Sequence, residues 1–542
     1  MKPGALRSLV LISALLPNLS NAADVSENSW YQAGREAVAK ARQQLPPRGR
    51  AHNVILFIGD GMGVPTVTAA RILEGQQQGQ PGEEHALSFE RFPWLALAKT
   101  YNTNQQVPDS AGTMTAMVTG VKTGAGILSL DETARRGDMT RVAESRIPTL
   151  FEQAEARGLA TGLVTTTRVT HATPAALYAH SPDRDWESDA KLPEAARRAG
   201  FPDIALQMID FPSGTEPKGP SKGLDVVLGG GRAVFVPPKE KGTRGDRRNL
   251  VAEWQTRHPT GSLPRSRTEL LALDPKDTTQ VLGLFSASHM DFEADRVAGK
   301  VDQPSLAEMT GFAIDVLSKN EKGYVLMVEG GRIDHAHHMN NARRALVDTL
   351  AFADAVQTAV DRTNAAETLL VVTADHGHVI TIGGFPTRGN PILGLVVDND
   401  REGEPQETPS RDLTGKPYTT LSYANGPGYH GASDAQREGA KTFPHAPRES
   451  KGIRRGRAKL AKVDTQSLDY LQEATVPLAY ESHSGEDVPV YAHGPGASLF
   501  RGVVEQSYLY HAIREALGWD APARTDPAQG RGATAPKPEP GR

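Results

Sequence analysis

The chain has 542 residues, of which 38% are hydrophobic and 23% charged, and its formal net charge is −4 at pH 7. This composition is typical of a globular protein with a large core, and the slightly acidic balance gives no reason to expect nucleic-acid binding. The absence of cysteine excludes disulfides and thiolate metal sites, so any metal must be held by Asp, Glu, His, Ser or Thr.

The N-terminus has the pattern of a secretory signal peptide over residues 1–22. Lys2 and Arg7 form a short basic region, and the mostly apolar run that follows, 9–16, is too short to span a bilayer. Ser20-Asn21-Ala22 is an acceptable cleavage site. We therefore expect a periplasmic or secreted protein; a buried N-terminal helix is the alternative.

Short apolar runs alternate with helical patterns along most of the remaining chain. This alternation predicts an α/β fold with a mainly parallel central sheet flanked by helices on both faces. The predicted strands are 54–58, 160–165, 225–228, 324–328, 369–373 and 488–491. The predicted helices are 28–43, 110–118, 147–157, 305–318 and 342–360.

The composition changes after His378. Residues 384–480 are interpreted as an insertion over the sheet, within a single domain over 23–520. Its strongly basic part, 435–462, is typical of a solvated surface segment. A binding site for an acidic partner or for a surface is the alternative. Residues 521–542 hold many Pro, Gly and Ala, which predicts disorder.

An acidic residue follows or ends each of three predicted strands. Asp60 follows the first, Glu329 directly follows 324–328, and Asp375-His376 follows 369–373. Because ligands bind at the carboxyl ends of parallel strands, these acids are expected to converge. Crowded carboxylates repel one another unless cations hold them, so the sequence predicts a multi-metal centre. For Asp375-His376 alone, a capped strand-to-loop turn is the alternative.

A histidine-rich segment follows Glu329. Asp334 and His338 are four residues apart, so in a helix they share one face, one turn apart. This spacing suits two ligands of one metal, with a third ligand from elsewhere in the chain. A surface turn without metal is the alternative.

Two further residues suggest phosphoryl chemistry. Ser110 opens a helix of small residues, where it is either an N-cap or a nucleophile. No Gly-x-Ser-x-Gly elbow surrounds it, so a nucleophilic role requires activation by a metal. Arg184 follows the strand 160–165 and can present a guanidinium fork to a phosphate or carboxylate. A surface ion pair with Asp183 or Asp185 is its alternative.

Taken together, these motifs resemble the alkaline phosphatase family, over about residues 50–518. The residues of these motifs are closer to the animal-type branch than to the enterobacterial type, notably at His171 and His335. The resemblance runs through DGMG, DSAGT, TTTRVTHATPAALYAHSPDRDW, VEGGRIDHAHH, TADHGH, YANGPGY and SHSGEDVPVYAHGP.

The resemblance implies a hydrolase of small phosphate monoesters that acts through a phosphoserine at Ser110. Arg184 is expected to clamp the phosphate, with Asp109 orienting it. Two zinc ions and one magnesium are implied, as are supporting roles for His171, His335 and, more weakly, His378. The ligands carried over are Asp334, His338 and His483 for one zinc, Asp60, Asp375 and His376 for the other, and Asp60, Thr173 and Glu329 for magnesium.

Some features depart from animal-type members. Ser286 stands where those proteins have a calcium-binding Glu, although Phe285 and Asp302 remain, so calcium is not expected. The polar tail also gives no reason to expect a stable membrane anchor. A homodimer is the expectation of the family.

Other functions on the same motifs are a phosphodiesterase or sulfatase with this metal core, or a metal-stabilised surface protein without activity. Glu329 and Thr173, which complete the magnesium site, favour monoesters. A protein without activity is expected to lack Ser110, Arg184 or a zinc ligand, and this chain has all of them.

Overall fold

The computed structural model describes residues 49–212 and 223–520. The predicted signal peptide (1–22), the predicted helix over 28–43 and the predicted tail (521–542) lie outside the described residues. No helix among those described is long and apolar enough to cross a membrane.

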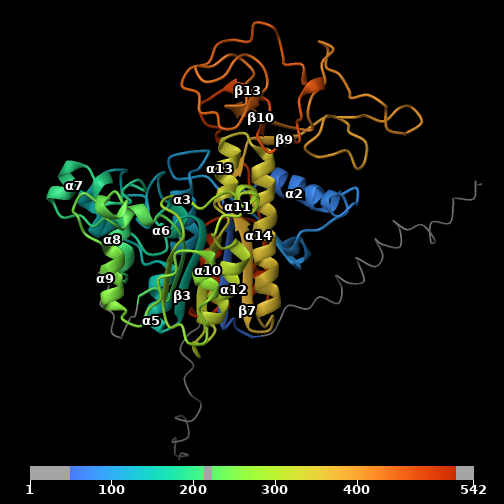
Figure 1. The fold of residues 1–542 in the computed structure, drawn as a ribbon. Helices are drawn as coiled ribbons and strands as arrows, with labels where there is room; N and C mark the ends of the chain where they lie inside the picture. Colours follow the sequence, from blue (N-terminus) through green and yellow to red (C-terminus); the bar gives the residue numbers. More distant parts are fainter. Residues whose placement is uncertain (1–48, 213–222, 521–542) are drawn as a thin grey trace, which may run out of the picture. The chain divides into compact units, whose positions relative to one another are not determined.

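A nine-stranded sheet forms the centre of the described part of the chain (Figure 1). Neighbouring strands are parallel except where β15 pairs with β2 and with β7. The predicted mainly parallel sheet is confirmed. In sheet order the strands are β16 (Gly502–Glu505), β2 (Trp94–Lys99), β15 (Val488–His493), β7 (Thr368–Ala374), β1 (Asn53–Gly59), β6 (Tyr324–Glu329), β3 (Ala160–Arg168), β4 (Val226–Gly230) and β5 (Val281–Leu284).

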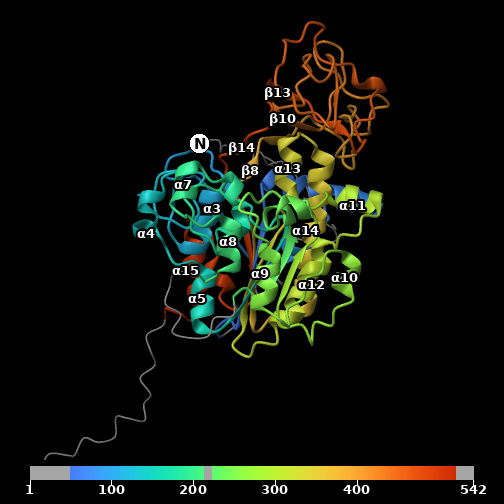
Figure 2. The same cartoon turned by 60° about the vertical axis from the view of Figure 1, so that its left-hand side comes forward.

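Helices cover both faces of this sheet, with α12 and α14 on one side and α3, α5 and α15 on the other (Figure 2). The ends of the helices follow from local chemistry: Ser305 and Thr149 form capping boxes with Glu308 and Glu152, so α12 and α5 begin one residue later. The described helices are α2 (Val64–Gln77), α3 (Ser110–Thr119), α4 (Val142–Ser145), α5 (Leu150–Arg157), α6 (Ala172–Ala175), α7 (Glu194–Arg198), α8 (Ile204–Ile209), α9 (Leu250–Arg257), α10 (Arg267–Leu271), α11 (Glu293–Gly299), α12 (Leu306–Leu317), α13 (Arg332–His338), α14 (Ala342–Arg362) and α15 (Tyr508–Ala516).

The register of the central strands brings the predicted acids to one edge. Ile58 of β1 pairs with Glu329 of β6, and Gly59 pairs with Ala374 of β7. The residues that follow, Asp60 and Asp375, therefore leave the sheet side by side. Gly61 then turns the chain with φ of 72°, and any side chain there would collide with the ring of His378.

The 384–480 segment lies beyond α13, where Figure 1 draws it in orange. A small sheet of β9 (Ile380–Ile382), β10 (Leu421–Gly426) and β13 (Ala474–Pro477) joins it to the main body. Asn340, just after α13, fastens this sheet: its amide nitrogen donates to the carbonyl of Asn425, and its side-chain oxygen accepts from the amide of Gly428. Short two-stranded pairings link β11 (Lys441–Thr442) with β12 (Tyr470–Leu471) and β8 (Gly377–His378) with β14 (His483–Ser484).

Candidate metal centre and active site

Asp60, Asp375 and His376 converge with Ser110 at the carboxyl edge of the sheet. The Nε2 atom of His376 lies 3.4 Å from Oδ1 of Asp60 and 3.4 Å from Oδ2 of Asp375. The same nitrogen lies 3.2 Å from Oγ of Ser110. Two acids, an imidazole and a hydroxyl thus surround one point, as the sequence predicted for the acids.

A second group of donors gathers around Oδ1 of Asp334. In the helix α13, His338 Nε2 lies 3.2 Å from this oxygen, which confirms that the two residues share a face. Nε2 of His483 lies 3.4 Å from it, and the two imidazole nitrogens are 3.2 Å apart. The antiparallel pairing of β8 with β14 places His483 there, opposite His378.

The histidines present their Nε2 atoms because their Nδ1 atoms are already bonded. Nδ1 of His483 donates to the carbonyl of Pro108 at 2.7 Å, and Nδ1 of His338 donates to the carbonyl of Glu481. Nδ1 of His376 donates to the carbonyl of Gly377 at 3.3 Å. A carbonyl oxygen can only accept, so each Nδ1 carries the proton and each Nε2 keeps a free lone pair. This is the arrangement that prepares histidine for a metal.

A third group, one strand further along the edge, contains Glu329, Thr173 and His171. The side chains of Asp60, His171 and Glu329 lie close enough together to hold one ion. One oxygen of Glu329 accepts from the hydroxyls of Thr165 and Thr167. Its other oxygen points away from both threonines.

The orphaned atoms in these groups fit bound cations. Among the described residues, no hydrogen-bond donor reaches either oxygen of Asp60, Oδ2 of Asp375, Oε1 of Glu329 or the hydroxyl of Thr173. All four side chains are completely buried. Buried oxygens without donors are costly, whereas oxygen ligands of this kind are what hard and borderline cations prefer.

The raised pKa values of the buried acids also indicate bound cations. Burial, followed by the charges of Asp375, Asp334 and Glu329, raises the pKa of Asp60 far above its ordinary value. Burial likewise raises the pKa of Asp375 and brings that of Glu329 to about 7, although the two threonine hydroxyls oppose it. The protein alone cannot keep these carboxylates ionised together, and divalent cations remove that difficulty.

Ser110 is not the N-cap of α3. That position belongs to Asp109, whose Oδ1 accepts from the amide of Gly112 at 3.1 Å, so Ser110 is the first helical residue. The N-cap interpretation of Ser110 is therefore wrong. Because Asp109 caps the helix, the Ser110 hydroxyl is available to face His376.

Arg184 also pairs with Asp109 and not with its chain neighbours. Its Nη1 donates to Oδ2 of Asp109 at 3.1 Å, and its Nη2 donates to Nε2 of His171 at 3.1 Å. Asp183 and Asp185 instead bind Arg136. Burial opposes ionisation of Asp109, but the charge of Arg184 and two backbone amides overcome it and lower the pKa of Asp109. The guanidinium is thus fixed beside the serine.

His378 directly contacts Asp334, although the sequence analysis gave it a weaker supporting role than His171 and His335. Its Nε2 is 2.9 Å from Oδ1 of Asp334, and its Nδ1 bonds to a carboxylate oxygen of Glu481. Burial lowers the pKa of His378, but the charge of Glu481 and the bond to Asp334 outweigh it and raise the pKa to about 10. Glu481 was missed, because nothing near it in the sequence marks a buried carboxylate.

His289 is a second residue that the sequence analysis missed. Its ring lies 4.2 Å from that of His335 and 5.4 Å from that of His171, measured between ring centres. Burial and the neighbouring Arg332 bring the pKa of His335 to about 3, so this cluster is neutral at physiological pH. Ser286 and Asp302, the two positions compared above with a calcium site, form local hydrogen bonds. Ser286 donates to the carbonyl of Ser288, and Asp302 accepts from Thr268.

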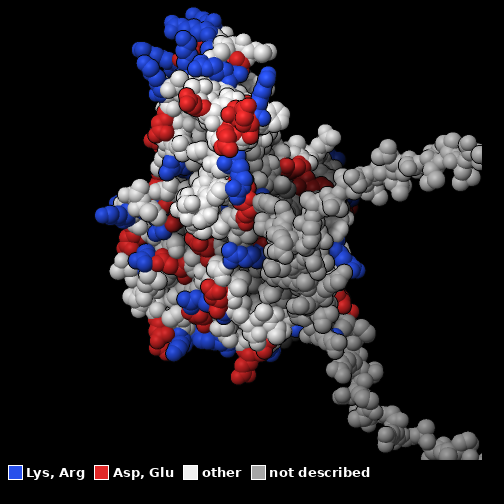
Figure 3. Space-filling view, turned by 90° about the vertical axis from the view of Figure 1, so that its right-hand side faces the viewer, with Lys and Arg blue, Asp and Glu red and all other residues white. Residues whose placement is uncertain are grey.

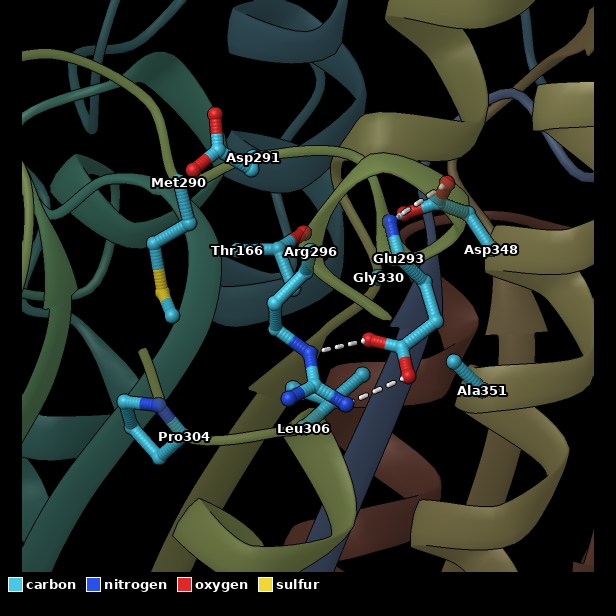
Figure 4. A pocket seen from close by; sticks show the side chains of 10 residues that line it. All are labelled: Thr166, Met290, Asp291, Glu293, Arg296, Pro304, Leu306, Gly330, Asp348 and Ala351. Carbon is cyan, nitrogen blue, oxygen red and sulfur yellow. Dashed lines mark hydrogen bonds and ion pairs between the residues drawn. The ribbon is translucent and has the colours of Figure 1, made fainter. Parts of the chain in front are cut away.

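A small cavity lies behind the turn between β6 and α13 (Figure 4). Its volume is about 10 Å³, room for about one water molecule. Asp348 and Glu293 line it, and a bidentate pair of Glu293 with Arg296 closes one side. The cavity is too small for a phosphate ester. It is therefore not the active site.

Asp348→Asn is expected to stabilise the metal-replete protein at alkaline pH. Burial raises the pKa of Asp348 from 3.8 to about 8, although Arg332 opposes this. Because its folded-state pKa lies above the unfolded-state value, the Asp348 carboxyl contributes stability that is fully present below about pH 4 and is lost as the pH rises to 8. The free energy of unfolding lost in this way is at most roughly 5 kcal/mol. We expect the variant to be more stable than the wild type by at least about 1 kcal/mol at pH 9 and by less at pH 5.

Urea unfolding at both pH values measures this difference. Asp361→Asn, at an exposed position near the end of the same helix, is the matched control. Equal destabilisation by Asp348→Asn at both pH values would show that the buried carboxylate is ionised throughout.

The fold and the site together define an enzyme with a buried cluster of metal-ligating residues beside a serine and an arginine. Comparison with known proteins identifies it further: residues 51–519 match the family model of alkaline phosphatase. The chain is 41% identical over 499 residues to the alkaline phosphatase of Gadus morhua, covering 89% of this chain and 95% of that one. It is 42% identical over 520 residues to the tissue-nonspecific isozyme of Gallus gallus, covering 92% of each.

Solved structures agree with these sequence matches. The crystal structure of Thermus thermophilus alkaline phosphatase has 26% sequence identity and a TM-score of 0.59, with 88% of this chain and 93% of that chain covered. Alkaline phosphatase from the Antarctic bacterium TAB5 shares the fold, at 21% identity and a TM-score of 0.55, over 87% of this chain and 100% of that one.

The chain belongs to the alkaline phosphatase family, and its similarity to the animal enzymes confirms the branch that the sequence indicated. It is a metal-dependent hydrolase of phosphate monoesters.

Proposed function

We propose that the hydrolysis proceeds through a phosphoserine at Ser110, with two zinc ions and one magnesium at the groups described above. The observation that carries the proposal is the position of the Ser110 hydroxyl, 3.2 Å from Nε2 of His376 and beside the orphaned oxygens of Asp60 and Asp375. This position suits a hydroxyl that is activated by a neighbouring metal ion.

The donor sets support the choice of metals. Two imidazoles and a carboxylate, from His338, His483 and Asp334, suit zinc. Asp60, Asp375 and His376 form a second set, with one imidazole and two carboxylates, that also suits zinc. Asp60, Thr173 and Glu329 offer only oxygens, which suits magnesium. When bound, such ions lower the pKa of a hydroxyl or water and stabilise the leaving oxygen.

The protein's own groups then define the reaction. Oγ of Ser110 attacks the phosphorus and loses its proton to water. The bond from phosphorus to the ester oxygen breaks, and the leaving oxygen takes a proton from water to become the alcohol. Arg184 and the free amides at the start of α3 hold the non-bridging oxygens. Asp109 and His171 keep the guanidinium in place. A water then attacks the phosphoserine from the side that the alcohol left, which releases phosphate and restores Ser110.

A paired assay of a phosphate monoester and a phosphate diester on metal-replete protein tests the substrate class. We expect kcat/KM for the monoester to exceed that for the diester by at least about a hundredfold. The reason is that Arg184 and the α3 amides hold the free non-bridging oxygens of a monoester, and a diester offers one fewer. Arg184→Ala is expected to reduce this ratio, and a diester preference in the wild type would favour a phosphodiesterase instead.

We further infer that the enzyme works outside the cytoplasm, in the periplasm or after secretion. The signal-like pattern of residues 1–22 supports this. Detection of a mature protein that begins near Ala23 in a periplasmic or secreted fraction tests it.

A further inference from the structure

A strongly basic surface lies on the 384–480 segment, and the hydrolysis described above does not use it. Between residues 435 and 462 the chain has nine Lys and Arg against two Glu, although its overall net charge is −4. Figure 3 shows Lys and Arg gathered over the loops of this segment. Seven of the nine are exposed and form what we term the basic face: Arg437, Arg448, Lys451, Arg454, Arg455, Lys459 and Lys462.

The cations of the basic face are not neutralised by ion pairs. Within residues 49–212 and 223–520, the ion pairs of the 435–462 run involve Arg457 alone, which binds Asp412 and Glu473. Two of the local acids, Asp434 and Glu438, are bonded to backbone amides. Glu438 accepts from the amides of Arg454 and Arg455 at 2.8 and 2.7 Å, so its carboxylate holds the loop and leaves both guanidinium groups to solvent.

The loop that carries the basic face is braced at several points. Asp434 accepts from the amide of Arg448 at 3.0 Å, and Ser433 forms an antiparallel bridge with Ser450. Nζ of Lys416 donates to the carbonyls of Arg455 and Arg457. A backbone held in this way loses less conformational entropy when its side chains bind a partner.

Apolar side chains stand beside these cations. Leu413, at the tip of the neighbouring turn, is fully exposed. Ile453 lies between Lys451 and Arg454 in the chain, and it lines, together with Leu413, a cavity of about 690 Å³. Leu413 is exposed to water and Ile453 partly so, and neither contributes to the site of hydrolysis.

We propose that the basic face, with Leu413 and Ile453, docks the enzyme reversibly on an anionic lipid surface. The guanidinium and ammonium groups pair with the lipid phosphates, and the two aliphatic side chains enter the adjacent acyl region. A soluble polyanion satisfies the cations but leaves Leu413 and Ile453 in water, which is why the lipid surface fits better. The inference goes beyond the proposed hydrolysis and does not depend on its chemistry.

Co-sedimentation of the full, metal-replete chain with vesicles tests the proposal. We expect binding to phosphatidylcholine vesicles that contain phosphatidylglycerol, loss of this binding at high salt, and little binding to phosphatidylcholine alone. Each cation near such a surface strengthens binding about fivefold. The triple variant Lys451→Gln, Arg454→Gln, Arg455→Gln should therefore bind about a hundredfold more weakly.

The matched control removes the same charge elsewhere, with Arg135→Gln, Lys191→Gln and Arg197→Gln, all of which are exposed near α4 and α7. This variant should bind the vesicles within about fivefold of the wild type. Both variants should hydrolyse a soluble monoester at the wild-type rate, which shows that they are folded.

Leu413→Ser separates a lipid surface from a soluble polyanion. It should weaken vesicle binding and leave binding to dextran sulfate unchanged. The proposal is overturned if the wild type ignores anionic vesicles, if it binds neutral ones equally, or if the two triple variants behave alike. Unchanged vesicle binding by Leu413→Ser, with full competition by dextran sulfate, would likewise overturn it in favour of a polyanion site.

Discussion

Ser110→Ala is expected to lower the turnover of a phosphate monoester by at least about a thousandfold, because it removes the hydroxyl that is proposed to attack phosphorus. Ser110 contributes none of the buried carboxylate or imidazole donors, which come from Asp60, Asp375 and His376. The variant should therefore keep its metals. Elemental analysis together with steady-state kinetics measures both effects.

Thr113→Ala is the matched control for this experiment. Its hydroxyl lies one turn further along α3 and donates only to the backbone carbonyls of Asp109 and Ser110. Turnover should stay within a few-fold of the wild type. Acid-quenched trapping of phosphate on the protein should succeed with wild type and Thr113→Ala and fail with Ser110→Ala. Wild-type turnover in Ser110→Ala would remove the serine from the mechanism.

Asp60→Asn is expected to weaken two metal positions at once. Both oxygens of Asp60 lack donors among the described residues, and the side chain borders His376 on one side and Glu329 on the other. Asn keeps the shape but loses the negative charge and one ligand oxygen. We expect metal affinity at both positions to fall by at least about a hundredfold and turnover to fall with it.

His483→Ala separates this double effect from general damage. His483 belongs to the group around Asp334 and does not contact Asp60. It should reduce zinc content and leave the magnesium position occupied, whereas Asp60→Asn should reduce both. If Asp60→Asn lowers one metal alone, Asp60 does not bridge the two positions.

The predictions from sequence that held depend on short-range patterns. Apolar runs 54–58, 324–328 and 369–373 became β1, β6 and β7, because a fully buried parallel strand needs apolar side chains on both faces. Once these strands are neighbours, the acids at their ends must lie at one edge. The helical spacing of Asp334 and His338 likewise required only a single turn of helix.

Other parts of the site could not be read from local pattern, because they depend on which distant groups compete for the same partner. Arg184 had two acids beside it in the chain, yet Arg136 binds both and leaves Arg184 to Asp109. Likewise, Asp109 caps α3 and so releases Ser110. Glu481 reaches His378 across a loop of about a hundred residues, through a contact that no sequence spacing indicates.

By itself, the sequence determined the class of fold, the metal-rich edge of the sheet and the acids and serine that gather there, because burial and strand direction follow from the pattern of apolar residues. The tertiary structure alone decided which partners these residues have in the site. It set His483 beside His338 through the pairing of β8 with β14, and it directed Arg184 to Asp109. It also placed no acidic side chain of the described residues in an ion pair with the cations of the basic face. Such contacts join residues far apart in the chain, so the packing of the whole chain determines them and local preference does not.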